Sequence, residues 1–326
     1  MDGHVAFVTG GARGMGRSHA LTLAREGADV ILLDVATKIE GLPPEIPPPD
    51  DLEATAAEIR ALGRRVVATH GDVRSQSDLD AAVAKGIQEL GKIDVLVANA
   101  GIWTIGRFWE LSEERWQLEI DVNLSGTWRS AKAVAPHMIE RGEGSIILTS
   151  SVLGFEGSHS AAHYVAAKSG VLGLMRTVAI ELGPYGVRCN AICPGFIDTK
   201  MNDRQDVYDL MAGGSDGTAA HRIQAARHWS LLAGRSALDP QSVSNAVLWL
   251  ASDDSADVTG IALPIDAGHL ATPGFNPAPV EQQAKWAPQD GSARPESVAS
   301  ARPVLVTPKE RDTEWMAAFP GCSKSR

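Results

Sequence analysis

Short apolar runs alternate with longer amphipathic segments along the first 271 residues of this 326-residue chain. Near-continuous Val, Ile and Leu runs predict buried strands, and periodic apolar positions between them predict helices. The strands are expected at residues 5–8, 29–33, 65–69, 93–98, 145–149, 187–192 and 261–264, and the helices at 18–24, 52–62, 77–90, 112–139, 161–182 and 240–251. This alternation indicates a mostly parallel sheet covered on both faces. We therefore predict one doubly wound α/β domain, a Rossmann fold with seven strands, over residues 1–271.

Two segments depart from the alternation. Residues 37–51, TKIEGLPPEIPPPDD, carry five prolines and are longer than the usual βα loop of about 2–6 residues. They are either a surface insertion or a flap over whatever binds at the strand ends. Residues 272–326 carry eight further prolines and many polar residues, which predicts a C-terminal extension without a core of its own. That extension is either disordered or anchored through Trp286 and the group Trp315, Met316 and Phe319.

Composition limits the classes of partner. The chain has 30 basic and 40 acidic side chains, a net charge of -10, and no Lys/Arg block, which argues against nucleic acid. It has no apolar run of about 18 residues and no signal-peptide pattern, so we expect a cytoplasmic protein without a membrane span. The three cysteines, Cys189, Cys193 and Cys322, are too few for a disulfide framework, and no metal site is expected.

A glycine-rich stretch, TGGARGMG, follows the first predicted strand and precedes the first predicted helix. Gly10, Gly14 and Gly16 permit a tight turn that directs backbone N–H groups and a helix N-terminus at one point, which suits a pyrophosphate. Arg13 and Met15 lie in the same turn. Asp34 ends the next strand, where a carboxylate accepts hydrogen bonds from a ribose 2′-hydroxyl and repels a 2′-phosphate. This favours NAD over NADP, although Arg13 offers NADP a phosphate partner.

The stretch TSSVLGFEGSHSAAHYVAAKSG, residues 149–170, places a tyrosine and a lysine one helical turn apart. In a helix, Tyr164 and Lys168 share one face. An ammonium beside a phenol favours the phenolate and so lowers the tyrosine pKa toward neutrality. Ser151 ends a predicted strand, where ligands bind in open α/β sheets, and its hydroxyl can bond a substrate oxygen. We infer an acid–base site built from these three residues.

These motifs and four others stand in the order found in the short-chain dehydrogenases/reductases, which residues 3–271 resemble. The further matches are the adenine-lining pair Asp72 and Val73, the Asn99, Ala100, Gly101 turn, the helix residue Asn123, and Pro194, Gly195 and Thr199 at the nicotinamide end. The resemblance implies NAD-dependent interconversion of a secondary alcohol and its ketone. It assigns acid–base catalysis to Tyr164, the nicotinamide ribose to Lys168, the substrate oxygen to Ser151, and a water linking Lys168 to solvent to Asn123.

Within that family the chain resembles the mycofactocin-associated group that includes carveol dehydrogenases. The proline-bearing loop after Asp34 supports this match. The resemblance to this group implies a tightly bound NAD and a redox carrier in place of free NAD exchange, and the resemblance to the wider family implies a homotetramer built on the helices 112–139 and 161–182. The chain departs from the group in having Cys193-Pro194-Gly195 where His-Pro-Thr is usual, and in the length of its C-terminal extension.

The substrate pocket is expected to be apolar. By position, its lining should include Trp103, Ser151, Val152, Phe155, His159, Phe196 and Met201, with residues 202–229 as a substrate lid. No Arg or Lys is placed to bind a carboxylate or phosphate, which favours a small hydrophobic alcohol or ketone, such as a cyclic terpenoid. Two alternatives stay open: an NADPH-dependent carbonyl reductase of the same fold, and a non-enzymatic nucleotide-binding scaffold in which the C-terminal extension is the functional part.

Overall fold

The computed structural model describes residues 1–35, 39, 42 and 51–272. Within these residues seven strands form one sheet in the order β3-β2-β1-β4-β5-β6-β7, and every neighbouring pair is parallel. The strands are β1 Val5–Thr9, β2 Asp29–Asp34, β3 Val66–His70, β4 Val95–Ala98, β5 Gly144–Thr149, β6 Val187–Pro194 and β7 Ala262–Ile265. The predicted doubly wound sheet is confirmed, and the chain reverses its direction of progress across the sheet between β1 and β4, where ligands bind in such folds.

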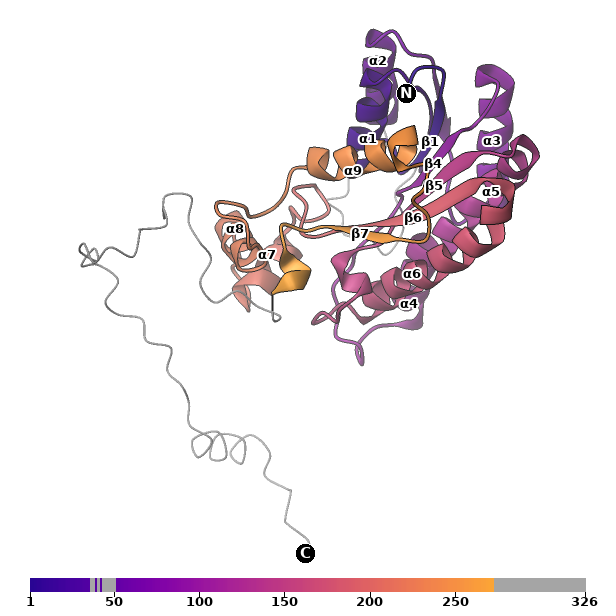
Figure 1. The fold of residues 1–326 in the computed structure, drawn as a ribbon. Coiled ribbons are helices and arrows are strands. Elements are labelled where there is room, and N and C mark those ends of the chain that lie inside the picture. Colours follow the sequence, from indigo (N-terminus) through magenta and orange to yellow (C-terminus); the bar gives the residue numbers. More distant parts are fainter. Residues whose placement is uncertain (36–38, 40–41, 43–50, 273–326) are drawn as a thin grey trace, which may run out of the picture. The chain divides into compact units, whose positions relative to one another are not determined.

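Helices cover both faces of the sheet (Figure 1). They are α1 Gly14–Arg25, α2 Asp51–Ala61, α3 Gln76–Leu90, α4 Glu113–Ile120, α5 Gly126–Arg141, α6 Ala162–Leu182, α7 Gln205–Ala212, α8 Ala219–His228 and α9 Pro240–Ala251. Helices α1, α2 and α9 lie on one side, and α3, α5 and α6 lie on the other. None of the helices in the described part of the chain is long and apolar enough to cross a membrane.

Alternate side chains of each strand enter different cores. On β1, Ala6 and Val8 are buried with residues of α1, α2 and α9, whereas Phe7 is buried with residues of α3, α5 and α6. Because a strand buried on both faces has no polar side, its sequence is a continuous apolar run. This explains why the strands could be located from the sequence.

One predicted helix, residues 112–139, is divided in the structure. Helix α4 ends at Ile120, a π-helical turn spans Asp121–Ser125, and α5 begins at Gly126. A π turn adds a residue to the helical repeat, which a search for a 3.6-residue period does not detect, and such turns are frequent at functional sites. The predicted catalytic residue Asn123 lies in the middle of this turn.

The two segments that interrupt the alternation are described only in part. Of the insertion at residues 37–51, the described residues are Ile39, Leu42 and Asp51, and the extension at residues 272–326 lies outside the described residues except for Thr272. The predicted lid, residues 202–229, contains α7 and α8.

Candidate active site

The glycine turn joins β1 to α1 and has the shape expected from the sequence. Gly10 and Gly14 have φ values of +67° and +54°, which glycine adopts without strain. At Gly16 an added Cβ would lie 2.0 Å from the backbone oxygen of Gly10, so no side chain fits there. At Gly14 an added Cβ would make only an ordinary contact with the Thr199 side chain, at 3.6 Å, and both Gly10 and Gly14 line open space.

That open space is a cavity of about 180 Å³ at the carboxyl ends of β1, β2 and β4, here called the strand-end cavity. Its lining includes the predicted residues Gly10, Arg13, Gly14, Met15, Asp34, Asp72, Val73, Asn99, Ala100, Gly101 and Thr199. The sequence did not identify Leu33, Val35, Gly71, Ile102, Val122 and Lys200 in this lining, nor Ile39 and Leu42 from the insertion. Since Leu42 is only 9% exposed, this part of the insertion belongs to the cavity wall.

Asp34 lies at the edge of the strand-end cavity with its carboxylate tied to the backbone. Its Oδ2 accepts the Ala12 N–H at 2.9 Å, and its Oδ1 accepts the Val35 N–H at 2.8 Å. Burial raises the pKa of Asp34, while these two N–H groups and Arg13 oppose the rise. The carboxylate is therefore held in one orientation next to the glycine turn.

A second cavity of about 530 Å³, here called the Tyr164 cavity, contains all four predicted catalytic residues. Asn123, Ser151, Tyr164 and Lys168 line it, as do Pro194 and Gly195. Met15, Asn99, Gly101, Ile102, Trp103, Thr199 and Met201 line both cavities, so the two adjoin. A ligand that extends from Asp34 to Tyr164 would lie along these shared residues.

Ser151, Tyr164 and Lys168 converge from two elements. Ser151 follows β5, and its Oγ accepts the Leu153 N–H at 3.1 Å at the start of a short 3₁₀ turn, Val152–Gly154. Tyr164 and Lys168 lie one turn apart on α6, with Lys168 Nζ 5.5 Å from the centre of the Tyr164 ring. Lys168 Nζ donates to the Thr149 backbone oxygen at 2.9 Å.

The pKa values of this group are governed by burial. Burial raises the pKa of Tyr164, and Glu119 raises it further, while a hydrogen bond with Ser151 lowers it. Burial also lowers the pKa of Lys168 to about 8. The sequence predicted that Lys168 lowers the pKa of Tyr164. In the protein alone, burial has the larger effect, and the pKa of Tyr164 is raised.

Six of the seven predicted substrate-pocket residues line the Tyr164 cavity: Trp103, Ser151, Val152, His159, Phe196 and Met201. Phe155 does not. It ends the 3₁₀ turn and is 47% exposed, and its neighbours Leu153 and Glu156 line the cavity instead. The position of a side chain just after a turn depends on backbone angles that residue type does not determine.

Several lining residues were not identified from the sequence. They are Leu153, Glu156, Gly157, Ser158, Ile197, Asn202, Leu210, Met211, Trp229 and His269, together with parts of β5 and of the shared wall. Glu156 Oε1 and His269 Nε2 are hydrogen-bond partners inside the cavity although 113 residues separate them. Four of them, Asn202, Leu210, Met211 and Trp229, belong to the segment 202–229 that the sequence predicted as a lid.

Comparisons with known proteins agree with this geometry. A family model described as short chain dehydrogenase matches residues 4–207. The (-)-trans-carveol dehydrogenase of Rhodococcus erythropolis is 40% identical over 271 residues, covering 82% of this chain and 98% of that protein. A crystal structure of carveol dehydrogenase from Mycobacterium avium in complex with NAD is 42% identical, with a TM-score of 0.81, and covers 83% of this chain and 99% of its own. A short chain dehydrogenase from Mycobacterium paratuberculosis bound to NAD is 37% identical with a TM-score of 0.73, covering 83% and 99%.

Proposed function

The chain belongs to the short-chain dehydrogenase family and is an NAD-dependent oxidoreductase of alcohols and ketones, and from this premise we propose that it interconverts a hydrophobic secondary alcohol and its ketone, with Tyr164 as the acid–base residue. The observation that carries the proposal is the placement of Ser151, Tyr164 and Lys168 in one cavity that shares a wall with the strand-end cavity.

The residues of the strand-end cavity fit NAD. The glycine turn is open at Gly14, and the Asp34 carboxylate stands beside it, fixed by two backbone N–H groups. A carboxylate there accepts hydrogen bonds from a ribose hydroxyl and repels a phosphate. Bound NAD supplies the acceptor for the hydride that leaves the carbinol carbon, and its oxidised ring adds a positive charge.

The chain's own residues then position the alcohol and move its proton. Ser151 Oγ hydrogen-bonds the substrate oxygen and so orients it toward Tyr164. In the direction of oxidation, the Tyr164 phenolate accepts the hydroxyl proton, and in the direction of reduction the phenol returns it. Lys168 places a buried positive charge beside the phenol, which stabilises the phenolate. Trp103, whose ring centre lies 6.3 Å from that of Tyr164, helps to exclude water.

The lining of the Tyr164 cavity supports a neutral, hydrophobic substrate. Phe196 and Trp229 pack with ring centres 5.5 Å apart, and Leu210 and Met211 extend the apolar wall. Glu156 is the sole carboxylate among the described lining residues, and it is paired with His269. Lys168 is the one Lys or Arg among the described lining residues, and its Nζ donates to the Thr149 backbone oxygen, so no cation in this lining is placed to bind a substrate carboxylate or phosphate. A small cyclic alcohol of the terpenoid kind suits the site, and a carveol dehydrogenase is among the relatives.

Tight retention of NAD is part of the proposal. Ile39 and Leu42 of the insertion line the strand-end cavity and contact the core. This favours the interpretation of the segment as a flap rather than as a surface insertion. A cofactor enclosed in this way would pass its electrons to a separate redox carrier. Absorbance and mass spectra of the purified protein before and after denaturation test this. NAD released at one equivalent only on unfolding supports retention, and empty protein that binds added NAD contradicts it.

A homotetramer built on the segments 112–139 and 161–182 is likewise proposed. The exposed apolar side chains Trp116, Trp128 and Ile180 lie on these segments, which gives them a second apolar face. Light scattering of the purified chain would measure the mass of the assembly, and a monomer would exclude this arrangement.

The Tyr164→Phe variant tests the catalytic assignment. With carveol as the probe alcohol and NAD as acceptor, kcat should fall about a thousandfold, because the general base is lost while the ring is kept. Tyr185→Phe is the matched control, since Tyr185 is half-exposed and outside both cavities. Binding of NAD should be unchanged in both variants. Undiminished turnover in Tyr164→Phe would exclude the mechanism.

A further inference from the structure

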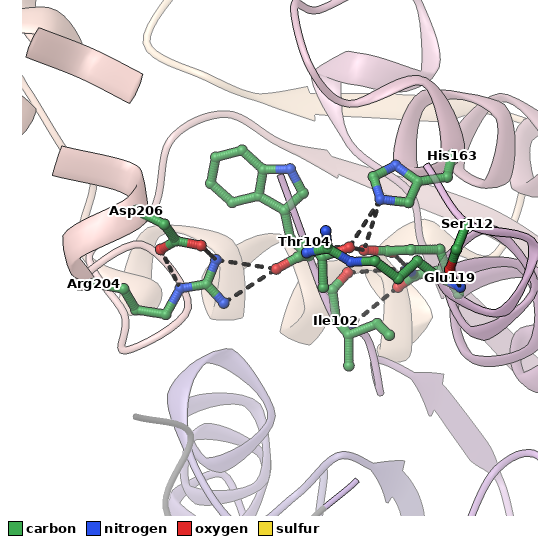
Figure 2. Close-up of polar contacts among 10 residues, drawn as sticks. Ile102, Thr104, Ser112, Glu119, His163, Arg204 and Asp206 are labelled. Atoms are coloured by element: carbon green, nitrogen blue, oxygen red, sulfur yellow. Dashed lines mark hydrogen bonds and ion pairs between the residues drawn. The ribbon is translucent and has the colours of Figure 1, made fainter. Parts of the chain in front are cut away.

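A buried carboxylate, Glu119, lies beside the catalytic group and has no part in the chemistry described above. It belongs to the last turn of α4 and is 0% exposed. Its Oε1 accepts the Thr104 backbone N–H at 2.6 Å and the Thr104 hydroxyl at 3.0 Å, and its Oε2 accepts Asn123 Nδ2 at 2.5 Å (Figure 2). Three donors on two oxygens match an ionised carboxylate, which accepts hydrogen bonds and donates none.

The partner of Glu119 on the catalytic side is Asn123, which is also fully buried. Asn123 Nδ2 donates to the Ile102 backbone oxygen at 3.0 Å as well as to Glu119, and its Oδ1 accepts the Ile102 N–H at 3.1 Å. The amide therefore has one orientation. A Cβ built on Gly101 would lie 2.9 Å from Asn123 Oδ1 and 3.7 Å from Lys168 Nζ, so these two atoms approach the same point.

Lys168 is the buried cation that balances Glu119. It is 3% exposed, and its Nζ donates to a neutral acceptor, the Thr149 backbone oxygen. Burial raises the pKa of Glu119 to about 7, and Lys168 opposes that rise. Burial lowers the pKa of Lys168 to about 8, and Glu119 opposes that fall. Each charge thus stabilises the other in a region where an isolated charge is costly.

Burial disfavours the charged forms of the histidine, the thiol and the phenol near this pair. His163 of α6 lies with Nε2 3.8 Å from Glu119 Oε1 and 2.8 Å from the Thr104 hydroxyl, and burial together with Arg115 lowers its pKa. Cys193 of β6 faces Lys168, and burial raises the pKa of its thiol. Tyr164 is protonated in the protein alone because burial raises its pKa. Glu119 is therefore the negative charge that acts on Lys168 and Tyr164 together.

We propose that Glu119 is a positioning residue of this enzyme: its carboxylate holds the Asn123 amide in place and keeps Lys168 positively charged beside Tyr164. This inference rests on the proposed function. It predicts the direction in which the pKa values of Lys168 and Tyr164 change when the charge of Glu119 is removed. Without the carboxylate, the Lys168 ammonium loses its balancing charge and gives up its proton at lower pH, and the Tyr164 phenolate loses a repelling neighbour and forms at lower pH.

The test replaces Glu119 by Gln, which removes the charge and keeps the size. The pH profile of kcat with carveol and NAD should move to lower pH by about 1 pH unit. The matched control is Glu113→Gln, the same change at an exposed position on the same helix, whose profile should stay in place. A profile for Glu119→Gln that coincides with the wild type overturns the proposal.

A second readout does not depend on turnover. The ¹³C NMR signal of the Lys168 ε-carbon, identified as the one lost in Lys168→Arg, should titrate at lower pH in Glu119→Gln than in the wild type. If the wild type oxidised no alcohol, the proposed function would fail while this titration still tested the charge pair. Glu119→Met serves if the Gln variant is unstable, and it should shift the titration equally, whereas Glu119→Asp should preserve it. An unchanged Lys168 titration in both neutral variants would contradict the proposal.

Discussion

Arg204 donates both of its terminal amino groups to the backbone oxygen of Trp103, each at 3.1 Å (Figure 2). The Arg204 side chain is 1% exposed, and it is also paired with Asp206 in the first turn of α7. Trp103 lines both cavities. The start of the proposed lid is therefore tied directly to the wall that faces Tyr164.

Replacing Arg204 by Met should loosen this wall. The Trp103 oxygen would lose two charged donors, at a cost of about 2 kcal/mol in the free energy of unfolding. We expect a lower Tm and a KM for the alcohol raised several-fold, with a smaller change in kcat, because Arg204 contacts the cavity wall and not the reacting atoms. Arg107→Met is the control, since Arg107 lies on the loop between β4 and α4 that also carries Trp103 and its side chain is 56% exposed. Equal KM values for the two variants would argue against a tie between lid and wall.

The glycine turn gives a second prediction through a matched pair of substitutions. In Gly16→Ala the new Cβ would lie 2.0 Å from the Gly10 oxygen and 2.7 Å from Asn99 Nδ2, so the turn itself must move. In Gly14→Ala the Cβ meets only the Thr199 side chain, at an ordinary contact distance of 3.6 Å, and only the φ of +54° is unfavourable. Urea unfolding should show a loss of about 3 kcal/mol for Gly16→Ala and about 1 kcal/mol for Gly14→Ala. NAD affinity should fall far more in Gly16→Ala, and a reversed order would contradict the steric argument.

The fold could be predicted from the sequence because its strands are buried on both faces. Residues 5–8 of β1 are a continuous apolar run for that reason, and the runs recur at spacings that require helical crossovers. The interior of the segment 112–139 could not be predicted. Its π turn changes the repeat by one residue over five positions, and that change leaves the apolar pattern of the flanking helices intact.

Site residues could be predicted from the sequence where their role depends on local spacing. They could not be predicted where it depends on contacts between distant parts of the chain. Tyr164 and Lys168 could be identified because they lie one helical turn apart. Gly14 and Gly16 could be identified because they permit a tight turn after a strand. Glu119 stands four residues before Asn123, but its contacts with Thr104 join residues 15 apart and depend on how the chain folds back. The pairing of Glu156 with His269 likewise depends on how the ends of the sheet are assembled.

Asp34 should control the choice between NAD and NADP. In Asp34→Asn the charge that repels a 2′-phosphate is lost, while one oxygen remains to accept a backbone N–H. Calorimetric titration of nucleotide-free protein should show the ratio of the NADP and NAD dissociation constants reduced about tenfold. Asp72→Asn is the control, since Asp72 lines the same cavity but is paired with Arg74. If Asp34→Asn keeps the wild-type ratio, Arg13 becomes the residue to test for phosphate recognition, and the NADPH-dependent alternative gains support.

His19 makes stability depend on pH. It is fully buried on α1, its Nδ1 lies 2.8 Å from the Ser244 hydroxyl, and its Nε2 has no hydrogen-bond partner in the described part of the chain. Burial lowers the pKa of His19 from 6.5 to about 3. The unfolded chain therefore binds a proton near pH 6.5 that the folded protein excludes, so the stability present above pH 6.5 is lost as the pH falls toward 3.

Between pH 8 and pH 5 this loss should reach about 2 kcal/mol from His19 alone. Urea unfolding of the wild type and of His19→Asn at several pH values measures it. Asn can keep a hydrogen bond to Ser244 but does not titrate, so its free energy of unfolding should fall less steeply with acidification even if it is lower throughout. Parallel curves for the two proteins would contradict the prediction, because they would mean that the folded protein binds the proton on His19 as readily as the unfolded chain does.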